Sequence, residues 1–220
     1  MDLHEALYTT RAMRRVTDEP IPLEAQTRIM DAAVRAPSGG NLQGWRFLLV
    51  DDTALIAALG PLYRDSMDQL WKTAYKDRIE AAARSPRDPD SIEFDKVRAS
   101  AQWLADHFET VPLYLFAFSR FDPSGGSIYP AVWSAMLAAR GEGVGSCLTG
   151  VLSVFHHAEV LELLGVPADQ GWVLSACVSL GYPTGRWGVA PRRAAHEVTH
   201  RNRWGAPAGF VADAPLWPAR

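Results

Sequence analysis

Hydrophobic and polar positions along the chain follow two periods, and each period predicts one kind of element. Apolar residues recur at helical spacing over 3–8 and over 23–35, where Pro22 precedes the first turn, so both stretches are predicted helices. The continuous apolar run 46–50 predicts a buried strand. The same patterns predict further helical stretches over 52–59, 62–83, 92–108, 128–140 and 157–164, and further strands over 111–118, 144–148 and 172–180.

Two stretches break these patterns. Residues 85–91 are polar and contain two prolines, which predicts an exposed loop rather than a domain boundary. Residues 204–220 are irregular, and they form either a disordered end or, as their aromatic side chains favour, an arm packed on another surface. No internal repeat is visible, so we expect one domain over 1–220 with a C-terminal arm over 204–220.

The succession of strands and helices suggests an α+β fold, in which a mixed sheet is covered by helices on both faces. At 220 residues and 48% hydrophobic content, the chain can bury a substantial core. The residues over 128–140 are mostly small and apolar, which permits close packing on more than one side. We therefore expect this helix in the core or at an interface.

Charge and hydropathy narrow the range of partners. The net charge of −3 gives no general electrostatic reason to expect binding to nucleic acid or to an anionic membrane. No apolar run approaches the roughly 20 residues that span a bilayer, and the N-terminus lacks a basic region followed by an apolar one. These features predict a cytoplasmic protein.

Cysteine and histidine residues give little support for a metal site. Cys147 and Cys177 lie in apolar, strand-like surroundings and are predicted to be buried free thiols. His196 and His200 have i, i+4 spacing, but no cysteine or carboxylate completes a metal-binding pattern, so no metal is expected. His107 has no evident catalytic partner and is expected at a helix end or on the surface.

The segment 36–45 is rich in residues that suit a binding loop. Its proline and glycines let the backbone turn sharply and approach a ligand, while Ser38, Asn41 and Gln43 offer short hydrogen-bonding side chains. The segment is either a ligand-cradling loop or a tight connection between a helix and a strand, because glycine and proline mark most connections.

Upstream, Arg11, Arg14 and Arg15 lie within five residues of one another. Arginine presents a planar fork of donors that suits phosphate, and backbone amides in a loop add to such a site. Taken alone, the cluster indicates either an anion site or a solvated face.

Together, the two segments resemble the start of the flavin-dependent nitroreductase family. The resemblance is carried by TRAMR at 10–14 and APSGGNLQGW at 36–45, in matching order and separation. Further along, GVGSCLTG at 143–150 resembles the mid-chain flavin loop of that family, and LGYP at 180–183 resembles the turn after its last core strand. Residues 191–193 and 197–198 resemble its C-terminal segment, so the similarity spans nearly the whole chain.

The resemblance implies an intertwined homodimer with two FMN sites at the subunit interface. It implies that Arg11 and Arg14 bind the FMN phosphate, with Arg192 or Arg193 completing the cage. Ala12 and Met13 would contribute backbone beside the ribityl chain. The sequence departs from the family at Ala12, where many relatives have serine, so one hydroxyl contact is lost.

Two further groups of flavin-binding residues are implied in the same way. From the partner subunit, the ring edge and ribityl hydroxyls would be held by Pro37, Ser38, Gly39, Gly40 and Asn41. One ring face would be covered by Leu148, Thr149 and Gly150, and a backbone amide at Thr149 or Gly150 would bond the flavin nitrogen that accepts hydride. The resemblance implies no protein acid, base or nucleophile.

The implied activity is FMN-dependent transfer of hydride from NADH or NADPH to a nitroaromatic, a quinone or a similar electrophilic small molecule, by a ping-pong mechanism. Relatives also reduce activated alkenes, remove halogen from phenols or break down flavin. A non-catalytic protein that binds or sequesters flavin is a further alternative. Tyr129 lies near the position where relatives place substrate-facing side chains, although an aromatic helix residue is more often part of a core.

Overall fold

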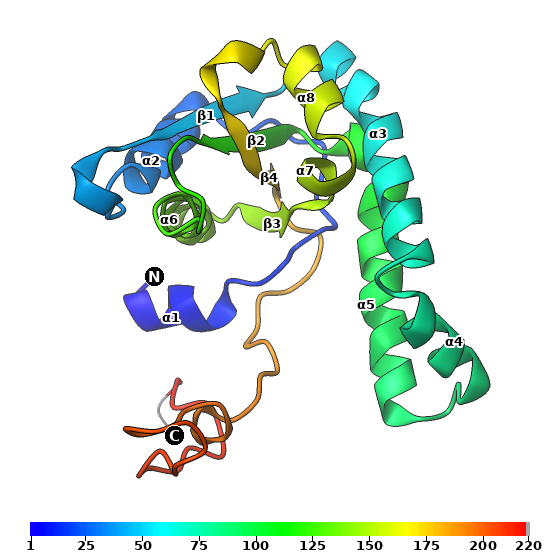
Figure 1. Ribbon diagram of the computed structural model, residues 1–220, viewed down its shortest axis with the longest axis vertical. Helices are drawn as coiled ribbons and strands as arrows, with labels where there is room; N and C mark the ends of the chain where they lie inside the picture. Colours follow the sequence, from blue (N-terminus) through cyan, green and yellow to red (C-terminus); the bar gives the residue numbers. More distant parts are fainter. Residues whose placement is uncertain (219–220) are drawn as a thin grey trace.

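The computed structural model describes residues 1–218, and the last two residues of the expected arm lie outside that range. Its centre is a four-stranded sheet of order β1-β2-β4-β3 (Figure 1). All three strand pairings are antiparallel, and the parallel part of the expected mixed sheet is one bridge between Ala12 and Ser146 within residues 1–218. The strands are β1 Trp45–Val50, β2 Leu113–Ser119, β3 Gly145–Thr149 and β4 Val173–Gly181.

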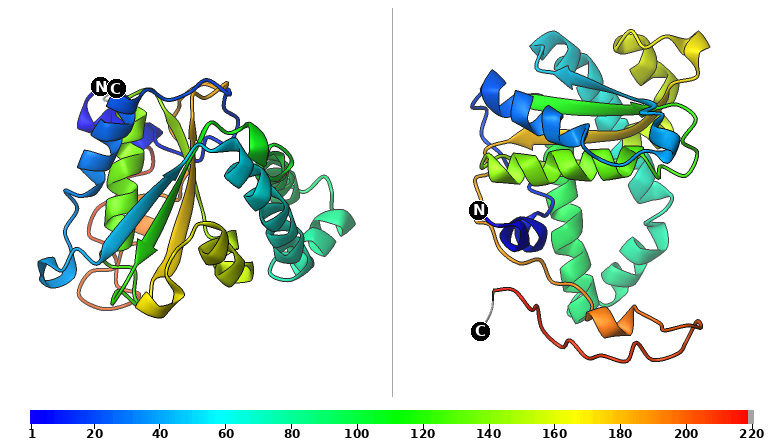
Figure 2. Two further views of the ribbon diagram at one scale, coloured as in Figure 1. Left: turned by 90° about the horizontal axis from the view of Figure 1, so that it is seen from above. Right: turned by 90° about the vertical axis from the view of Figure 1, so that its left-hand side faces the viewer.

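Helices cover both faces of this sheet, so the predicted α+β class is confirmed (Figures 1 and 2). One face carries α2, Leu23–Ala33, and α6, Ile128–Gly141. The other carries α3, Thr53–Lys72, α7, Val151–Phe155, and α8, His157–Leu163.

Strand β2 shows why the sheet has two apolar faces. Successive side chains of a strand point to opposite faces, and every residue of β2 is buried. Leu113, Leu115 and Ala117 belong to the core beneath α2 and α6, whereas Tyr114 and Phe116 belong to the core beneath α3. The continuous apolar run in the sequence is therefore the signature of a central strand covered on both sides.

The boundary predicted near Pro61 is wrong. Helix α3 runs through Gly60 and Pro61 without interruption. Gly60 packs against Glu109, since a Cβ atom there would lie 2.0 Å from Glu109 Oε1. The predicted stretch 62–83 instead breaks at Thr73, and α4, Lys76–Arg84, begins after the chain has turned.

The exposed loop predicted over 85–91 is shorter than expected. Asp88 caps α5, Pro89–Asp106, by accepting a hydrogen bond from the Asp90 amide at 3.1 Å. Pro89 occupies the first turn, where its missing N–H has no helical partner to lose. Helix α7 was not predicted, because five residues are too few for a helical period to show.

The remaining segments lie at the edges of the fold. Helix α1, Leu3–Thr9, lies beside α6, and the chain that follows β4 passes it towards the C-terminus (Figures 1 and 2). The described part of the arm is irregular, with Trp204 94% exposed and Trp217 packed 5.9 Å from Tyr8. Cys147 and Cys177 are buried free thiols, as predicted. Among residues 1–218, no helix combines the length and apolar character needed to cross a bilayer.

Candidate functional site

The arginine-bearing N-terminal segment lies against the end of the sheet. Its Met13 amide donates to the carbonyl of Ser146 in β3 at 2.9 Å, and Val16 forms a bridge with Pro183 after β4. Two glycines permit this approach. A Cβ atom on Gly145 would stand 2.9 Å from the Cβ of Met13, and one on Gly181 would stand 2.7 Å from Val16.

Arg14 points from this segment into a cavity of about 140 Å³ between β3 and the helices α3 and α5. Its Nη1 donates a 3.3 Å hydrogen bond to Ser100 Oγ on α5. Leu148 and Thr149 line the same cavity, so the structure brings these three predicted residues together. Four aromatic side chains complete much of the wall, namely Tyr63, Trp71, Tyr75 and Phe94.

Sequence reasoning missed these aromatic residues. Tyr63, Met67 and Trp71 recur every four residues along α3, which is the spacing of one helical face. That periodicity identifies a buried face, but it does not distinguish a core contact from a cavity wall. Only the fold places this face opposite Arg14 and Thr149.

Burial favours the neutral forms of Tyr63 and Cys147, which both line this cavity. The Tyr63 hydroxyl donates to Thr149 Oγ1 at 3.4 Å, and burial raises the pKa of Tyr63 well above its ordinary value. Burial also raises the pKa of the Cys147 thiol, against the opposing effect of Arg14. Arg14 is therefore the charged group of this wall, which favours an anionic or electron-rich ligand atom beside it.

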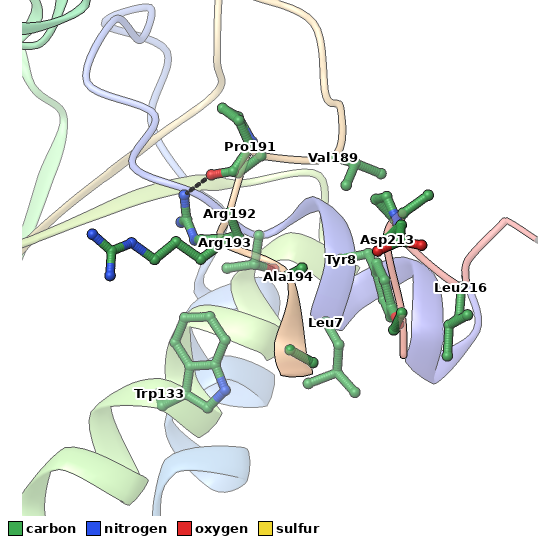
Figure 3. Close-up of a pocket in the computed structure, with 16 residues that line it drawn as sticks. Leu7, Tyr8, Trp133, Val189, Pro191, Arg192, Arg193, Ala194, Asp213 and Leu216 are labelled. Carbon is green, nitrogen blue, oxygen red and sulfur yellow. Dashed lines mark hydrogen bonds between the residues drawn. The ribbon is translucent and has the colours of Figure 1, made fainter. Parts of the chain in front are cut away.

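Arg192 and Arg193 line a second, larger cavity, of about 720 Å³, between α1, α6 and the C-terminal arm (Figure 3). Both side chains are exposed, and Arg192 Nη1 donates to the carbonyl of Pro191 at 2.8 Å. Thr10 lines the same cavity, and its buried Oγ1 has no hydrogen-bond partner among the described residues. The start of the N-terminal arginine segment thus shares a cavity with the C-terminal arginine pair.

The glycine-rich loop is held in a turned conformation by one of its own side chains and by a serine just before α6. Ser38 Oγ accepts from the Gln43 amide at 3.1 Å, and Ser127 Oγ accepts from the Gly39 amide at 3.2 Å. Gly40 and Asn41 have left-handed φ values of 56° and 53°. Pro37 and residues 39–41 are exposed, so the loop presents its backbone outwards.

This loop and the arginine segment lie at opposite ends of the sheet. The loop leads into Trp45, which pairs with Ser119 at one end of β2. The arginine segment bridges to Ser146, which pairs with Leu180 and through it with Leu113 at the other end. At about 3.4 Å per residue, the length of β2 separates them by roughly 20 Å. One chain therefore does not bring the two groups together.

Tyr129 lies on the surface rather than in the core. Its ring packs over Gly125, its residue is 46% exposed, and its hydroxyl donates to the carbonyl of Ser175 at 3.2 Å. It lines a concavity of about 660 Å³ together with Gly150. Space is open above Gly150, because a Cβ atom added there would meet no atom within 4 Å.

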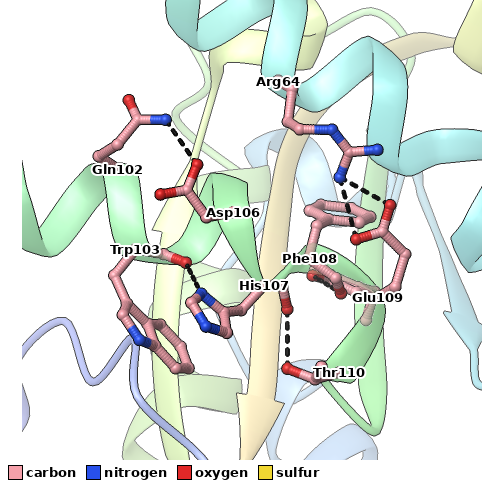
Figure 4. Close-up of polar contacts among 9 residues, drawn as sticks. Arg64, Gln102, Trp103, Asp106, His107, Phe108, Glu109 and Thr110 are labelled. Atoms are coloured by element: carbon pink, nitrogen blue, oxygen red, sulfur yellow. Dashed lines mark hydrogen bonds and ion pairs between the residues drawn. The ribbon is translucent and has the colours of Figure 1, made fainter.

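Structural contacts are made by His107, His196 and His200. His107 ends α5 as predicted, stacks on Trp103 with a ring separation of 4.2 Å, and contacts its carbonyl through Nδ1 (Figure 4). His196 Nδ1 accepts from the Ala212 amide at 3.3 Å, and His200 packs on Trp204. Within residues 1–218, no group of three or more His, Cys, Asp or Glu side chains is arranged to hold a metal ion.

Comparison with known proteins shows the family of this chain. A family model described as "Nitroreductase family" matches residues 7–182. The chain belongs to the nitroreductase family. It is 41% identical over 189 residues to an NADH dehydrogenase of Thermus thermophilus, a match that covers 83% of this chain and 87% of the relative.

Two proteins with different names are also similar to this chain. A 5,6-dimethylbenzimidazole synthase of Rhodospirillum rubrum is 29% identical over 192 residues, covering 81% of each chain. The crystal structure of oxidized iodotyrosine deiodinase bound to FMN and 3-iodo-L-tyrosine has a TM-score of 0.71 and 25% identity, covering 92% of this chain and 99% of that one. The chain is therefore an oxidoreductase of the nitroreductase family, and the proteins similar to it are named for different reactions.

Proposed function

We propose that the protein is an FMN-dependent oxidoreductase that transfers hydride from NADH or NADPH to nitroaromatic, quinone or similar electrophilic small molecules, with donor and acceptor using the site in turn. The observation that carries the proposal is the meeting of Arg14 with Leu148 and Thr149 in one cavity next to the open backbone at Gly150. Leu148 and Thr149 are expected to cover one face of the flavin ring, and Arg14 is expected to bind the FMN phosphate. All three line this cavity.

The residues present fit FMN. A flat ring needs open backbone on one side, which Gly150 provides. The phosphate needs cationic forks, which Arg11 and Arg14 would provide together with Arg192 or Arg193. The unpartnered Thr10 hydroxyl beside Arg11 is a further donor that a phosphate or ribityl oxygen would satisfy. When bound, FMN supplies the two-electron chemistry, and the chain's own groups bind it, orient it and exclude water.

A homodimer is part of the proposal. The roughly 20 Å that separate the loop at 37–41 from the arginine segment mean that a single chain leaves the loop unused. A second copy supplies that loop to complete each site, so Pro37, Ser38, Gly39, Gly40 and Asn41 act on the partner's flavin. The exposed, outward-facing loop backbone supports this assignment.

The test is an absorption spectrum of the purified protein, followed anaerobically as NADH or NADPH is added. We expect flavin bands that one nicotinamide bleaches and that a nitroaromatic or quinone then restores. NADH is the first donor to try, because the relative at 41% identity is named an NADH dehydrogenase. A colourless protein that cannot be reconstituted with FMN would contradict the proposal, and flavin bands that neither donor bleaches would favour a sequestering role.

A reductive dehalogenase of phenols is the second candidate. The structural similarity to iodotyrosine deiodinase and the aromatic wall of the cavity both favour a phenolic substrate over an alkene. The two reactions differ in their products, so the reduced protein is offered 3-iodotyrosine and a nitrobenzene separately. Release of iodide without reduction of the nitro group would replace the first candidate by the second.

A further inference from the structure

Arg140 is the one charged residue that is buried among residues 1–218. It lies near the end of α6, with its side chain 10% exposed. Burying a cation costs desolvation free energy unless the cation is fully paired, so the contacts of Arg140 indicate its role. Its Nε donates to Thr9 Oγ1 at 2.9 Å, its Nη2 donates to Glu5 Oε1 at 3.1 Å, and its guanidinium lies 4.1 Å from the ring centre of Trp187.

These contacts join two chain segments that are far apart in sequence. Glu5 and Thr9 belong to α1, which directly precedes the arginine segment. Trp187 belongs to the segment that follows β4 and leads to Arg192 and Arg193. Arg140 therefore holds both segments against the same end of α6.

The same two segments also meet directly. The Thr17 amide donates to the carbonyl of Tyr182 at 2.8 Å, and the Thr184 amide donates to the carbonyl of Arg15 at 3.0 Å. Farther along, Arg11 Nη2 donates to the carbonyl of Arg186 at 3.0 Å. Arg140 contacts Thr9 in the N-terminal segment and Trp187 in the segment after β4. These residues lie just beyond the last of the hydrogen bonds above, so Arg140 continues the contact between the two segments.

We propose that Arg140 is a positioning residue, which holds Arg11 and the segment bearing Arg192 and Arg193 in place for the FMN phosphate. The proposal rests on the function proposed above. Arg140 does not contact the phosphate itself, because its Nε and Nη2 are bound to Thr9 and Glu5 and its face is covered by Trp187. The role requires arginine, since a lysine ammonium cannot donate in this fork while it stacks on an indole.

A selective loss of affinity for FMN over riboflavin distinguishes this positioning role from a general role in the stability of the fold. Riboflavin lacks the phosphate of FMN, so the ratio of the riboflavin dissociation constant to the FMN dissociation constant measures the phosphate cage alone. A variant that loosens the whole fold weakens both flavins equally. A variant that displaces the arginines weakens FMN selectively.

The experiment measures both dissociation constants by flavin fluorescence quenching for the wild-type apoprotein, Arg140→Met, Arg140→Lys and the control Arg28→Met. Arg28 is 60% exposed and pairs with Glu142 just after α6, so its removal breaks an ion pair at the same helix end without touching either segment. We expect Arg140→Met to lower the ratio about tenfold, Arg140→Lys to lower it nearly as much, and Arg28→Met to leave it within about twofold of wild type.

Trp187→Leu removes one side of the contact and gives a second measurement if Arg140→Met does not fold. We expect it to lower the ratio in the same direction. An unchanged ratio in the folded variants, or equal weakening of both flavins, would overturn the positioning role. A wild-type protein that binds neither flavin would instead overturn the proposed function, so the two failures are distinguishable.

Discussion

Gly145 in β3 touches Met13 so closely that a Cβ atom on the glycine would stand 2.9 Å from the Cβ of Met13. The contact places the backbone between Arg11 and Arg14 directly on the strand that carries Leu148 and Thr149. Hydrogen bonding between the Met13 amide and the Ser146 carbonyl fixes the register of the two segments. The positions of the groups proposed to bind the FMN phosphate and the flavin ring are thereby coupled through one glycine.

Gly145→Ala is expected to separate the two segments. The added methyl group has to displace Met13, at a cost of about 1–3 kcal/mol, and the FMN dissociation constant should rise about tenfold. Flavin titration and thermal denaturation measure the two effects. Gly141→Ala is the matched control, because the same methyl group there meets only the end of the Met1 side chain at 3.7 Å. Equal flavin affinity in both variants would contradict the coupling.

Arg14→Ala is expected to release flavin and to lower activity in parallel. Arg14 is the charged group of the cavity wall, and its guanidinium is anchored by Ser100. The neighbouring Arg15 is exposed and lies over Trp103 instead, so Arg15→Ala should keep the wild-type flavin content. Flavin per protomer is read from the absorption spectrum. If Arg14→Ala retains all of its flavin, the assignment of Arg14 fails.

Mixing two inactive variants tests whether the glycine-rich loop serves the partner subunit. Gly40 has a φ of 56°, so Gly40→Val should distort the loop and empty the site that it completes. In a heterodimer of Arg14→Ala and Gly40→Val chains, one shared site carries both lesions and the other carries none. Co-purified heterodimers should therefore hold about half of the wild-type flavin. No recovery above the two parent homodimers would indicate that each loop serves its own chain.

His156 lies between two carboxylates and links α3 to α8. His156 Nε2 lies 2.7 Å from Asp65 Oδ2, and Nδ1 lies 3.2 Å from Glu159 Oε1. Burial by itself would lower the pKa of His156, but the two carboxylates outweigh it and raise this pKa above the ordinary 6.5. Hydrogen bonds to His156 and Gln69 lower the pKa of Asp65, and a backbone hydrogen bond and His156 lower that of Glu159.

This arrangement predicts a defined pH window. A raised histidine pKa contributes stability fully below pH 6.5, and the contribution is lost as pH rises through the folded-state value. Lowered carboxylate pKa values contribute above pH 4.5, and their contribution is lost as pH falls. The difference in melting temperature between wild type and His156→Asn should therefore be largest between these limits. His4→Asn, at an exposed position on α1, is the control, and a pH-independent difference would contradict the prediction.

Local sequence was sufficient for most elements and misleading at a few boundaries. The apolar run near Leu115 predicts a central strand correctly, because burial on both faces leaves no polar position. Pro61 suggests a helix end, yet α3 continues through it, and Pro89 suggests a loop where it begins α5. Pro89 lies in the first turn of α5, where its missing N–H costs no helical hydrogen bond. Pro61 lies inside α3, where proline is unfavourable, so the packing of α3 rather than local preference keeps that helix continuous.

The sequence by itself determined the α+β class, the family and the residue types of the candidate site, because those follow from local periodicity and from short motifs whose order is fixed along the chain. Only the tertiary structure decided which of these residues meet. It brought Arg14 to Thr149 and to the aromatic face of α3, buried Arg140 between α1 and Trp187, and left Ser38 at the opposite end of the sheet. Such meetings depend on strand register and on close approaches at Gly145 and Gly181, which no local pattern encodes.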